Sequence, residues 1–589
     1  MIQAADDIVI KICGSAGDGS ISAVEILNRA AALMGYHIMN FDAYPAEIRG
    51  FGKSVGHTRI SRSVLLTTGK YTDCLVALDD VHAITELSTM SKRGVLIYDS
   101  KPPQYHQEDQ AVAGFIEPGM IGYGIPLREL STIAVRSSRS RNIVALGVLA
   151  ALLHLQAEYF ETAIRKRFSA KPETVIDNNI NAFRLGFDYT LQNVNKYDEL
   201  DFQHHVYSSN RDSIIMSGNE AAARACLDAD LRLYAGYPIT PATRIMEILA
   251  KELPLKGGFV VQTEDEISAA GHVVGAGFAG ARSLTATSGP GICLMSEMIN
   301  LAVMAEIPSV FIDSQRGGPS TGLPTKTEQS DFNIAAFGGS GDSPRPVLAP
   351  TSVPECYLLT RIAFDLAECY QTPVIILMDF FLSNRFEDID LNQLNSNVFG
   401  RFTPQTAPLK DQPYLRFEVT DTGISPRAIP GMENMFHTVT GLEHDERGFP
   451  NYGKANHLKM TAKRHKKMET LVRDWQETGT FGPEGQLDVG FISWGSSVGA
   501  VMEAISLLND QNIHSGGFFP RLLSPLQTSH LEVFSRRCKR IIVVEMNYTG
   551  QYANYLQVAI SKRMERFTRV DAEPISSEDI VNWIIKDES

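Results

Sequence analysis

The sequence predicts a multidomain α/β protein built on doubly wound, mostly parallel sheets. Strand-like and helix-like segments alternate along three blocks of the 589-residue chain: 8–186, 216–385 and 487–589. Dense alternation of this kind is typical of parallel strands connected by helices. A chain of this length also exceeds what one hydrophobic core accommodates. The predicted division is 1–190, a linker at 191–215, then 216–385, an irregular connecting segment at 386–485, and 486–589.

The first block begins with a β-branched run, followed by the loop "GSAGDGS" and a segment with helical periodicity. Two later apolar runs predict further strands, and two longer segments predict helices. We expect these elements to form a mostly parallel sheet covered by helices. The expected strands are 8–13, 74–78 and 94–99, and the expected helices are 21–35, 139–155 and 158–168.

The second and third blocks repeat the alternation at higher density, which predicts a doubly wound sheet. In the second block we expect strands at 231–236, 258–262, 283–287, 309–313 and 373–379, and helices at 218–229, 242–252, 266–280, 292–306 and 352–370. In the third we expect strands at 487–495, 516–520 and 540–546, and helices at 498–510, 530–538 and 551–564. The segment between these blocks, 386–485, lacks clear strands, so we expect it to wrap other domains or to contact a partner.

Composition narrows the class of protein. Lys plus Arg is 54 and Asp plus Glu is 68, so the net charge is −14, which argues against nucleic acid as a partner. No stretch is long and apolar enough to span a membrane, and the N-terminus lacks the basic region of a signal peptide. Seven scattered cysteines without a CxxC pair predict a reducing cytoplasm and no metal site on this chain.

The stretch "YPITP" at 237–241 places a lone hydroxyl, Thr240, between two prolines at the expected start of a helix. Pro241 suits the first helical turn, so we expect Thr240 to be the N-cap. A helix N-terminus with an added hydroxyl suits a carboxylate or phosphate. A plain helix cap is the alternative.

Three further stretches of this block follow expected strands. "EDE" at 264–266 opens a helix rich in Gly and Ala, and its alternative role is to complement the helix dipole. "TSGPG" contains Ser288 and Gly289 in a turn that can approach a ligand. Arg316 follows the strand 309–313, at a carboxyl end of the sheet where doubly wound folds bind ligands. Its guanidinium can hold a carboxylate through two parallel hydrogen bonds.

Taken in order, "YPITP", "EDEISA", "TSGPG" and "QRGGPSTGLPTKTEQ" resemble the alpha subunit of the 2-oxoacid:ferredoxin oxidoreductases, with "GNEAAA" opening that domain and "VVEMNYTGQ" in the last. "GSAGDGS" and "FDAYPAEIRGFGKSVGHTRIS" resemble the family's gamma domain, fused ahead of alpha. The resemblance covers nearly the whole chain and is weakest at 386–485. It implies a Rossmann-like gamma domain, a thiamine-diphosphate-binding pyrimidine-type doubly wound domain and a transketolase-C-terminal-like α/β domain.

The resemblance also implies roles for individual residues. Glu266 matches the glutamate that bonds the pyrimidine N1′ of thiamine diphosphate and promotes loss of the C2 proton. The acids Glu264 and Asp265 directly precede it and compete with it for this assignment. Thr240 and Arg316 match positions that bind the carboxylate and keto group of the substrate. The residues expected to contact the cofactor are Glu266, Tyr237, Pro238, Ser288 and Gly289.

Three other features carry competing interpretations. Arg244 stands where the family, which usually reads "YPITPST" or "YPITPAS", continues with an acid. It can face a second substrate carboxylate, as 2-oxoglutarate requires, or lie on a helix surface. "GDG" at 17–19 with Asn40 resembles a thiamine diphosphate and magnesium motif, but the surrounding segment matches the gamma domain. That loop can also bind an anion such as a CoA phosphate. The basic run 459–467 is a second CoA candidate, against a solvated helix face.

The resemblance implies an enzyme that converts a 2-oxoacid and CoA to acyl-CoA, carbon dioxide and reduced ferredoxin, or runs the reverse carboxylation. Thiamine diphosphate is shared with a beta subunit, on which Mg²⁺ and a 4Fe-4S cluster are expected. We expect a cytoplasmic assembly of two alpha and two beta subunits that donates electrons to ferredoxin. 2-Oxoglutarate is favoured over pyruvate; indolepyruvate or branched-chain 2-oxoacids and a non-catalytic regulatory or scaffold subunit are alternatives.

Overall fold

The computed structural model describes residues 7–42, 52–101, 111–202, 213–390, 412–475, 477 and 479–588. Outside these ranges lie part of the gamma-like motif (43–51), part of the predicted linker (203–212) and part of the predicted connecting segment (391–411). The chain forms two compact units. Unit 1 contains residues 1–216 and 385–393, and unit 2 contains 217–384 and 394–589.

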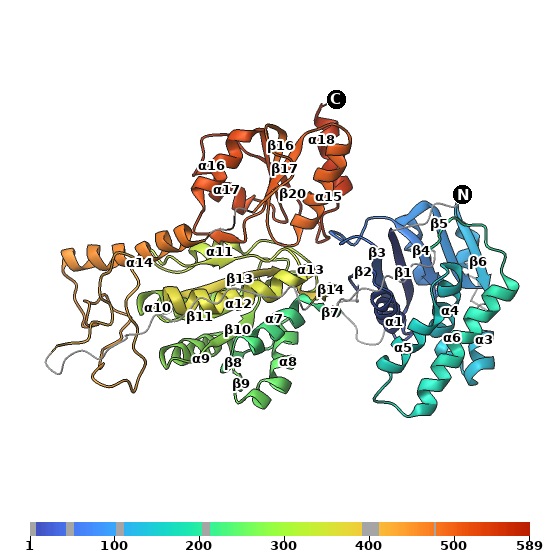
Figure 1. Cartoon of the computed structure of the whole chain (residues 1–589), viewed down its shortest axis with the longest axis horizontal. Helices are drawn as coiled ribbons and strands as arrows, with labels where there is room; N and C mark the ends of the chain where they lie inside the picture. Colours follow the sequence, from blue (N-terminus) through green and yellow to red (C-terminus); the bar gives the residue numbers. More distant parts are fainter. Residues whose placement is uncertain are drawn as a thin grey trace. The chain divides into compact units, whose positions relative to one another are not determined.

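Unit 1 is built on an eight-stranded sheet in the order β6-β5-β4-β1-β3-β2-β14-β7, coloured blue to teal in Figure 1 apart from β14. Its apolar core lies between the sheet and the helices, with α4 buried along almost its whole length. The strands are β1 (Asp7–Ser15), β2 (His37–Asn40), β3 (Lys53–Ser61), β4 (Thr72–Ala77), β5 (Met90–Asp99), β6 (Ile121–Ile125), β7 (Ser213–Ser217) and β14 (Phe386–Asp390). The helices are α1 (Ser20–Leu33), α2 (Asp80–Ile84), α3 (Leu127–Val135), α4 (Arg141–Leu152), α5 (Ala157–Arg167) and α6 (Glu173–Asn193).

The prediction that this first sheet is mostly parallel is wrong. β1, β4, β5 and β6 are parallel, but the pairs β1–β3, β2–β3 and β2–β14 are antiparallel. β3 carries Lys53, His57 and Arg59, so hydrophobicity alone did not mark it as a strand. β3 lies between β1 and β2 in the sheet and pairs antiparallel with both.

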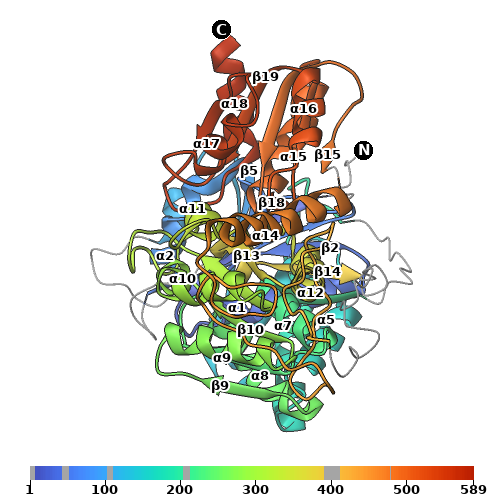
Figure 2. The same ribbon diagram turned by 90° about the vertical axis from the view of Figure 1, so that its left-hand side faces the viewer.

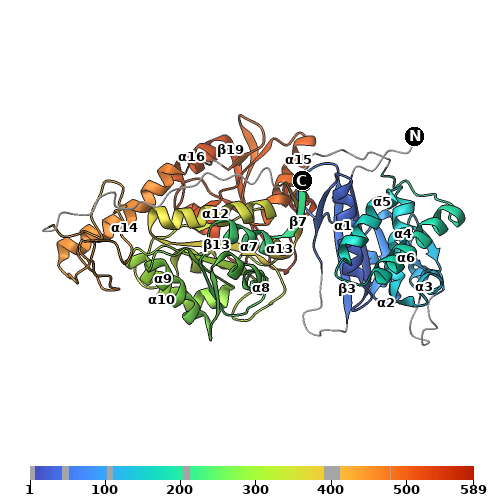
Figure 3. The ribbon, with the colours of Figure 1, turned by 60° about the horizontal axis from the view of Figure 1, so that its bottom comes forward.

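Unit 2 contains a seven-stranded sheet in the order β18-β12-β13-β11-β10-β8-β9, parallel except for β18. Its strands are β8 (Leu233–Gly236), β9 (Phe259–Gln262), β10 (Ser283–Thr287), β11 (Ser309–Gln315), β12 (Val347–Leu348), β13 (Pro373–Asp379) and β18 (Leu522–Ser524). Its helices are α7 (Gly218–Asp228), α8 (Thr243–Glu252), α9 (Glu266–Phe278), α10 (Gly289–Met304), α11 (Phe332–Phe337), α12 (Val353–Tyr370) and α13 (Phe380–Asn384). This confirms the doubly wound prediction. α12 and α13 both contact α7 (Figure 3), and α9 packs against α10.

A five-stranded sheet in the order β15-β17-β16-β19-β20 forms the C-terminal part of unit 2. Its strands are β15 (Thr480–Phe481), β16 (Leu487–Ser493), β17 (Ser515–Phe518), β19 (Cys538–Glu545) and β20 (Glu565–Thr568), and its helices are α15 (Ser497–Asp510), α16 (Thr528–Arg537), α17 (Gln551–Gln557) and α18 (Ser577–Glu588). β18 comes from this region (Figure 2) yet pairs with β12 at the edge of the middle sheet. One apolar core therefore continues from α9 and α10 to α16 and α17, which joins the two sheets.

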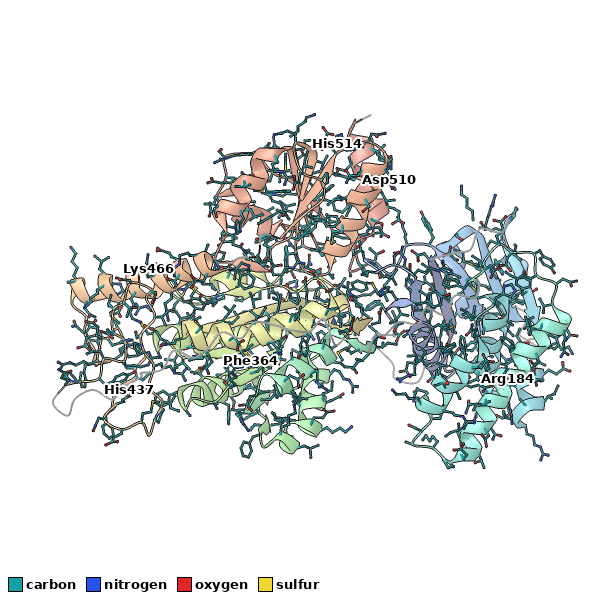
Figure 4. All side chains as sticks on the ribbon, viewed as in Figure 1. Arg184, Phe364, His437, Lys466, Asp510 and His514 are labelled. Carbon is teal, nitrogen blue, oxygen red and sulfur yellow. The ribbon has the colours of Figure 1, made fainter. Side chains whose placement is uncertain are left out.

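The predicted irregular segment contains a long helix, α14 (Lys454–Asp474), as well as β14 and β15. The sequence from 454 to 474 has low mean hydropathy and many charges, which concealed the helix. Figure 4 shows Lys466 on α14, His437 in the coil that precedes it, and Phe364 on the buried helix α12. The helix predicted at 551–564 is also shorter, because α17 ends at Gln557 before β20 begins.

Candidate active site at the carboxyl edge of the middle sheet

The predicted site residues of unit 2 meet at one edge of its sheet. β8, β9, β10 and β11 are parallel neighbours, so the loops after their carboxyl ends lie together (Figure 1). Tyr237 to Thr240 follow β8, and Glu266 begins α9 after β9. Ser288 and Gly289 follow β10, and Arg316 follows β11. This edge is where open α/β sheets bind their ligands.

Arg316 and Thr240 are in direct contact. Nη1 of Arg316 donates a hydrogen bond to the Thr240 carbonyl oxygen at 2.8 Å. The Arg316 side chain is buried, and its Nε has no hydrogen-bond partner among the described residues. Burial lowers the pKa of Arg316, and the nearby Asp331 raises it. A buried guanidinium with free donors is suited to an anionic ligand.

The prediction that Thr240 is the N-cap of the following helix is wrong. α8 begins at Thr243, and its N-cap is Ala242, which has no side chain to cap with. A turn at 240–242 intervenes, closed by a hydrogen bond from the Thr243 N–H to the Ile239 carbonyl oxygen at 3.0 Å. Thr240 is exposed, and no described residue bonds its hydroxyl. The hydroxyl is therefore available to a ligand instead of being used by the helix.

The three acids of "EDE" take three different environments. Glu264 is exposed, and Asp265 caps α9 by accepting a hydrogen bond from the Ser268 N–H at 2.7 Å. Glu266 is only 7% exposed, and within the described chain nothing donates a hydrogen bond to its carboxylate. Its oxygens are not among the fully buried polar atoms that lack a partner, so a ligand at the sheet edge can reach them. Of the three acids, Glu266 is thus the one placed to bind a ligand inside the fold.

Glycines allow the turn after β10 to approach Glu266. A Cβ on Gly291 would lie 1.9 Å from the Thr287 Oγ1 and 2.9 Å from the Glu266 Cγ. A Cβ on Gly289 would lie 2.7 Å from the Asp331 Oδ2. Any side chain at these positions would displace its neighbours. The "TSGPG" turn therefore brings β10, Glu266 and Asp331 into one compact group.

Buried polar atoms without partners are concentrated at the same edge. Leaving one such group unsatisfied costs about 1–3 kcal/mol, so a cluster of them indicates a place that a ligand completes. Of the residues that carry these atoms, the sequence analysis identified only Ser288 and Arg316. The other residues lie in or beside the quoted motifs, and that position was the only indication of them in the sequence. The atoms are Thr285 Oγ1, Thr287 Oγ1, Ser288 Oγ, both carboxylate oxygens of Asp313, Gln315 Nε2, Arg316 Nε and Asp331 Oδ2.

Arg244 lies on the exposed side of α8. Its guanidinium pairs with Glu220 at 3.0 Å and with Glu247 at 3.2 Å. Hydrogen bonds to both acids raise its pKa. This is the environment expected of a helix-surface residue, and a role toward a distal substrate carboxylate stays a prediction.

The "GDG" loop and Asn40 are used within unit 1. Asp18 accepts a hydrogen bond from the Ser15 N–H at 2.9 Å and pairs with Arg141 at 2.6 Å. The Asn40 side chain donates to Asp42 and to the His57 carbonyl oxygen. Within the ranges that the structure describes, no group of three or more His, Cys, Asp or Glu could hold a metal ion.

The interpretation of residues 459–467 as a solvated helix face is wrong in part. Lys463 and Lys467 are buried and bond the carboxylate of Glu306, at 2.7 Å and 3.1 Å. Arg416 donates to the Glu306 carbonyl oxygen at 2.7 Å. Burial lowers the pKa of Lys467 to about 7, although Glu306 raises it. Lys463 and Lys467 therefore attach α14 to the middle domain, and part of the basic run is used inside the fold.

Together, the fold and this group of side chains define a multidomain α/β protein whose candidate ligand site lies at the carboxyl edge of a doubly wound domain. In the part of the chain that is described, no helix has the length and apolar character needed to cross a membrane. All seven cysteines are free.

Comparisons with known proteins identify the family. Residues 224–464 match the family model "Pyruvate flavodoxin/ferredoxin oxidoreductase, thiamine diP-bdg", and residues 9–189 match "Pyruvate ferredoxin/flavodoxin oxidoreductase". The chain is 30% identical to 2-oxoacid:ferredoxin oxidoreductase 2, subunit alpha, of Aeropyrum pernix, over 98% of this chain and 97% of that protein. It is 31% identical to 2-oxoglutarate oxidoreductase subunit KorA of Mycobacterium tuberculosis, over 99% and 92%.

A solved structure agrees with these relatives. The 2-oxoglutarate:ferredoxin oxidoreductase of Magnetococcus marinus, with 2-oxoglutarate, coenzyme A and succinyl-CoA bound, matches with a TM-score of 0.93 and 35% identity. The match covers 99% of this chain and 100% of that chain. This chain belongs to the 2-oxoacid:ferredoxin oxidoreductases, as an alpha subunit with the gamma-type domain in the same polypeptide. The resemblance stated from the sequence is confirmed.

Proposed function

We propose that this chain is the catalytic alpha/gamma subunit of an enzyme that converts 2-oxoglutarate and CoA to succinyl-CoA, carbon dioxide and reduced ferredoxin, or runs the reverse carboxylation. The observation that carries the proposal is that one sheet edge holds both Glu266, a largely buried acid, and Arg316, a buried guanidinium whose Nε has no partner among the described residues. 2-Oxoglutarate is chosen because the Magnetococcus marinus structure that this chain resembles has it bound.

The residues at this edge fit thiamine diphosphate. Glu266 is placed to accept a hydrogen bond from the pyrimidine N1′, since its carboxylate is buried and lacks a donor among the described residues. The ring would lie against the glycine-containing turn at Ser288 and Gly289 and against Tyr237 and Pro238. When bound, the cofactor supplies the nucleophilic carbon and the electron sink that decarboxylation requires.

The substrate is held by the chain itself. Arg316 is positioned by the Thr240 carbonyl oxygen and keeps free donors for the carboxylate next to the keto group. The Thr240 hydroxyl, which no described residue bonds, can donate to the keto oxygen. Burial of Arg316 strengthens its hold on an anion, because few waters compete there.

The proposed enzyme requires a beta subunit. We place the diphosphate-bound Mg²⁺ and a 4Fe-4S cluster on that subunit, because the resemblance to the family implies that the beta subunit carries them. The assembly would contain two alpha and two beta subunits in the cytoplasm and pass electrons to ferredoxin. CoA would enter as a substrate.

Anaerobic co-expression with a beta subunit of the same family tests this proposal. The complex is assayed for CoA-dependent reduction of ferredoxin with 2-oxoglutarate, pyruvate, indolepyruvate and a branched-chain 2-oxoacid. We expect the highest kcat/KM with 2-oxoglutarate. A higher value with another 2-oxoacid would refute the substrate, and a complex that assembles but oxidises none of the four would indicate a regulatory or scaffold subunit.

A further inference from the structure

Asp331 occupies the N-cap position of α11 but does not cap it. Asp is among the residues that most favour this position, because its side chain accepts hydrogen bonds from the first turn. Here no side-chain capping bond forms. The Asp331 Oδ2 is instead buried without a partner among the described residues, 2.7 Å from where a Cβ on Gly289 would lie. The side chain thus points away from its own helix and toward the "TSGPG" turn of the proposed site.

The surroundings of Asp331 are polar and incompletely bonded. Its backbone N–H donates to the Gln315 Oε1 at 3.1 Å, while the Gln315 Nε2 has no partner in the described chain. Asp313, on the same strand as Gln315, is fully buried with both carboxylate oxygens unpartnered. The Ser288 hydroxyl is buried and unpartnered as well. Arg316 follows Gln315 directly, so these groups share one edge with the guanidinium assigned to the substrate.

The two carboxyl groups cannot both be ionised near neutral pH. Burial raises the pKa of Asp331 to about 7, with a further increase from Glu328 and a decrease from Arg316. The pKa of Asp313 is raised well above its ordinary value by burial and by Asp331. The pair therefore loses its first proton near neutrality and holds the second.

The groups that face Asp331 come from three elements and one loop. Arg316 follows β11, Glu328 lies in the loop before α11, and Cys293 on α10 has its thiol pKa raised by burial, Asp331 and Asp313. The neighbouring residue of α17, Gln551, is uncharged and bonds the Ser330 carbonyl oxygen and the Asn333 N–H. Arg316 is thus the cation whose charge Asp331 modulates.

We propose that Asp331, supported by Asp313, is a further positioning residue of the 2-oxoacid site that makes binding of the anionic substrate depend on pH through Arg316. This rests on the proposed function. Neutral Asp331 leaves the charge of Arg316 available to the substrate carboxylate. Ionised Asp331 offsets that charge and repels the carboxylate. Binding therefore favours the protonated form and weakens as pH rises through the titration of Asp331.

The pH profile of kcat/KM in the assembled complex tests the inference, since kcat/KM reports groups of the free enzyme. With a pKa of about 7, the protonated fraction falls roughly 25-fold between pH 6.5 and pH 8.5. The ratio of wild type to Asp331→Asn, measured at each pH with 2-oxoglutarate, should follow this fall, because Asn stays neutral. Titrations of groups that are not coupled to Asp331 cancel in the ratio. A ratio that is constant from pH 6.5 to pH 8.5 would overturn the inference, even if the variant were less active throughout.

Glu328→Gln is the matched second variant. Glu328 accepts hydrogen bonds from the Gly318 N–H and the Ser330 hydroxyl, and Gln retains an acceptor for both. Removing its charge lowers the pKa of Asp331, so the alkaline fall in kcat/KM should move to lower pH while keeping its size. If Asp331→Asn does not assemble, this shift supports the inference and an unmoved profile overturns it. Failure of the wild-type complex to turn over any 2-oxoacid would refute the proposed function itself.

Discussion

Replacing Arg316 by Ala tests the assignment of the substrate carboxylate. The guanidinium is buried, and only its Nη1 bond to the Thr240 carbonyl oxygen, at 2.8 Å, is made within the described chain. The substrate would therefore meet free, desolvated donors. A charge-assisted bond of this kind contributes about 1.5–3 kcal/mol, so kcat/KM should fall roughly ten- to a few hundred-fold for every 2-oxoacid.

The assay is CoA-dependent ferredoxin reduction by the co-expressed complex, together with exchange of the thiamine C2 proton. The loss should appear in kcat/KM, while C2 proton exchange changes little, because Arg316 acts on the substrate and not on the cofactor. Arg316→Lys should recover only part of the activity, since an ammonium group cannot reproduce the planar fork of Arg. A normal kcat/KM in Arg316→Ala would show that the loop after β11 has a structural role and does not bind the substrate.

Arg244→Ala is the matched control on the exposed side of the same region. Arg244 already pairs with Glu220 and Glu247, so we expect kcat/KM to stay near the wild-type value for both 2-oxoglutarate and pyruvate. A selective loss with 2-oxoglutarate would instead place Arg244 at the distal carboxylate.

Three other predictions follow from the same features. Glu266→Gln should retain the fold but lose C2 proton exchange and activity by orders of magnitude, whereas Glu264→Gln should behave as wild type. The reverse result would mean that Glu264 bonds the cofactor. The purified chain without its beta subunit should show no iron–sulfur absorbance and bind thiamine diphosphate weakly, which a brown, cofactor-loaded chain would contradict. Glu306→Gln leaves the buried Lys463 and Lys467 without their counter-charge and should destabilise unit 2 by about 3–5 kcal/mol. A lower apparent Tm and faster proteolysis of α14 would show this loss. Glu469→Gln, in an exposed pair, should change the Tm little, and equal Tm values for the two variants would refute the prediction.

Much of the fold could be predicted because the apolar runs and helical periodicity that indicate it involve residues close together in the sequence. The strands of the middle sheet read as short apolar runs, and the helices between them show clear periodicity, since both faces of a parallel sheet are buried. The same regularity placed Thr240, Glu266 and Arg316 after strands that turned out to be neighbours in the sheet. By contrast, β3 and α14 carry charged residues whose partners are distant in sequence, so local hydrophobicity did not indicate them.

The sequence by itself determined the family, the alternation of strands and helices, and the loops that carry the site, because these depend on residues close together in the chain. The tertiary structure alone decided which acid of "EDE" is buried, that Thr240 is free of the helix cap, and that Lys463 and Lys467 share one buried glutamate. It also placed Asp331 against Gly289 and beside Asp313. Burial and charge coupling depend on segments brought together from distant parts of the chain, and no local pattern records that proximity.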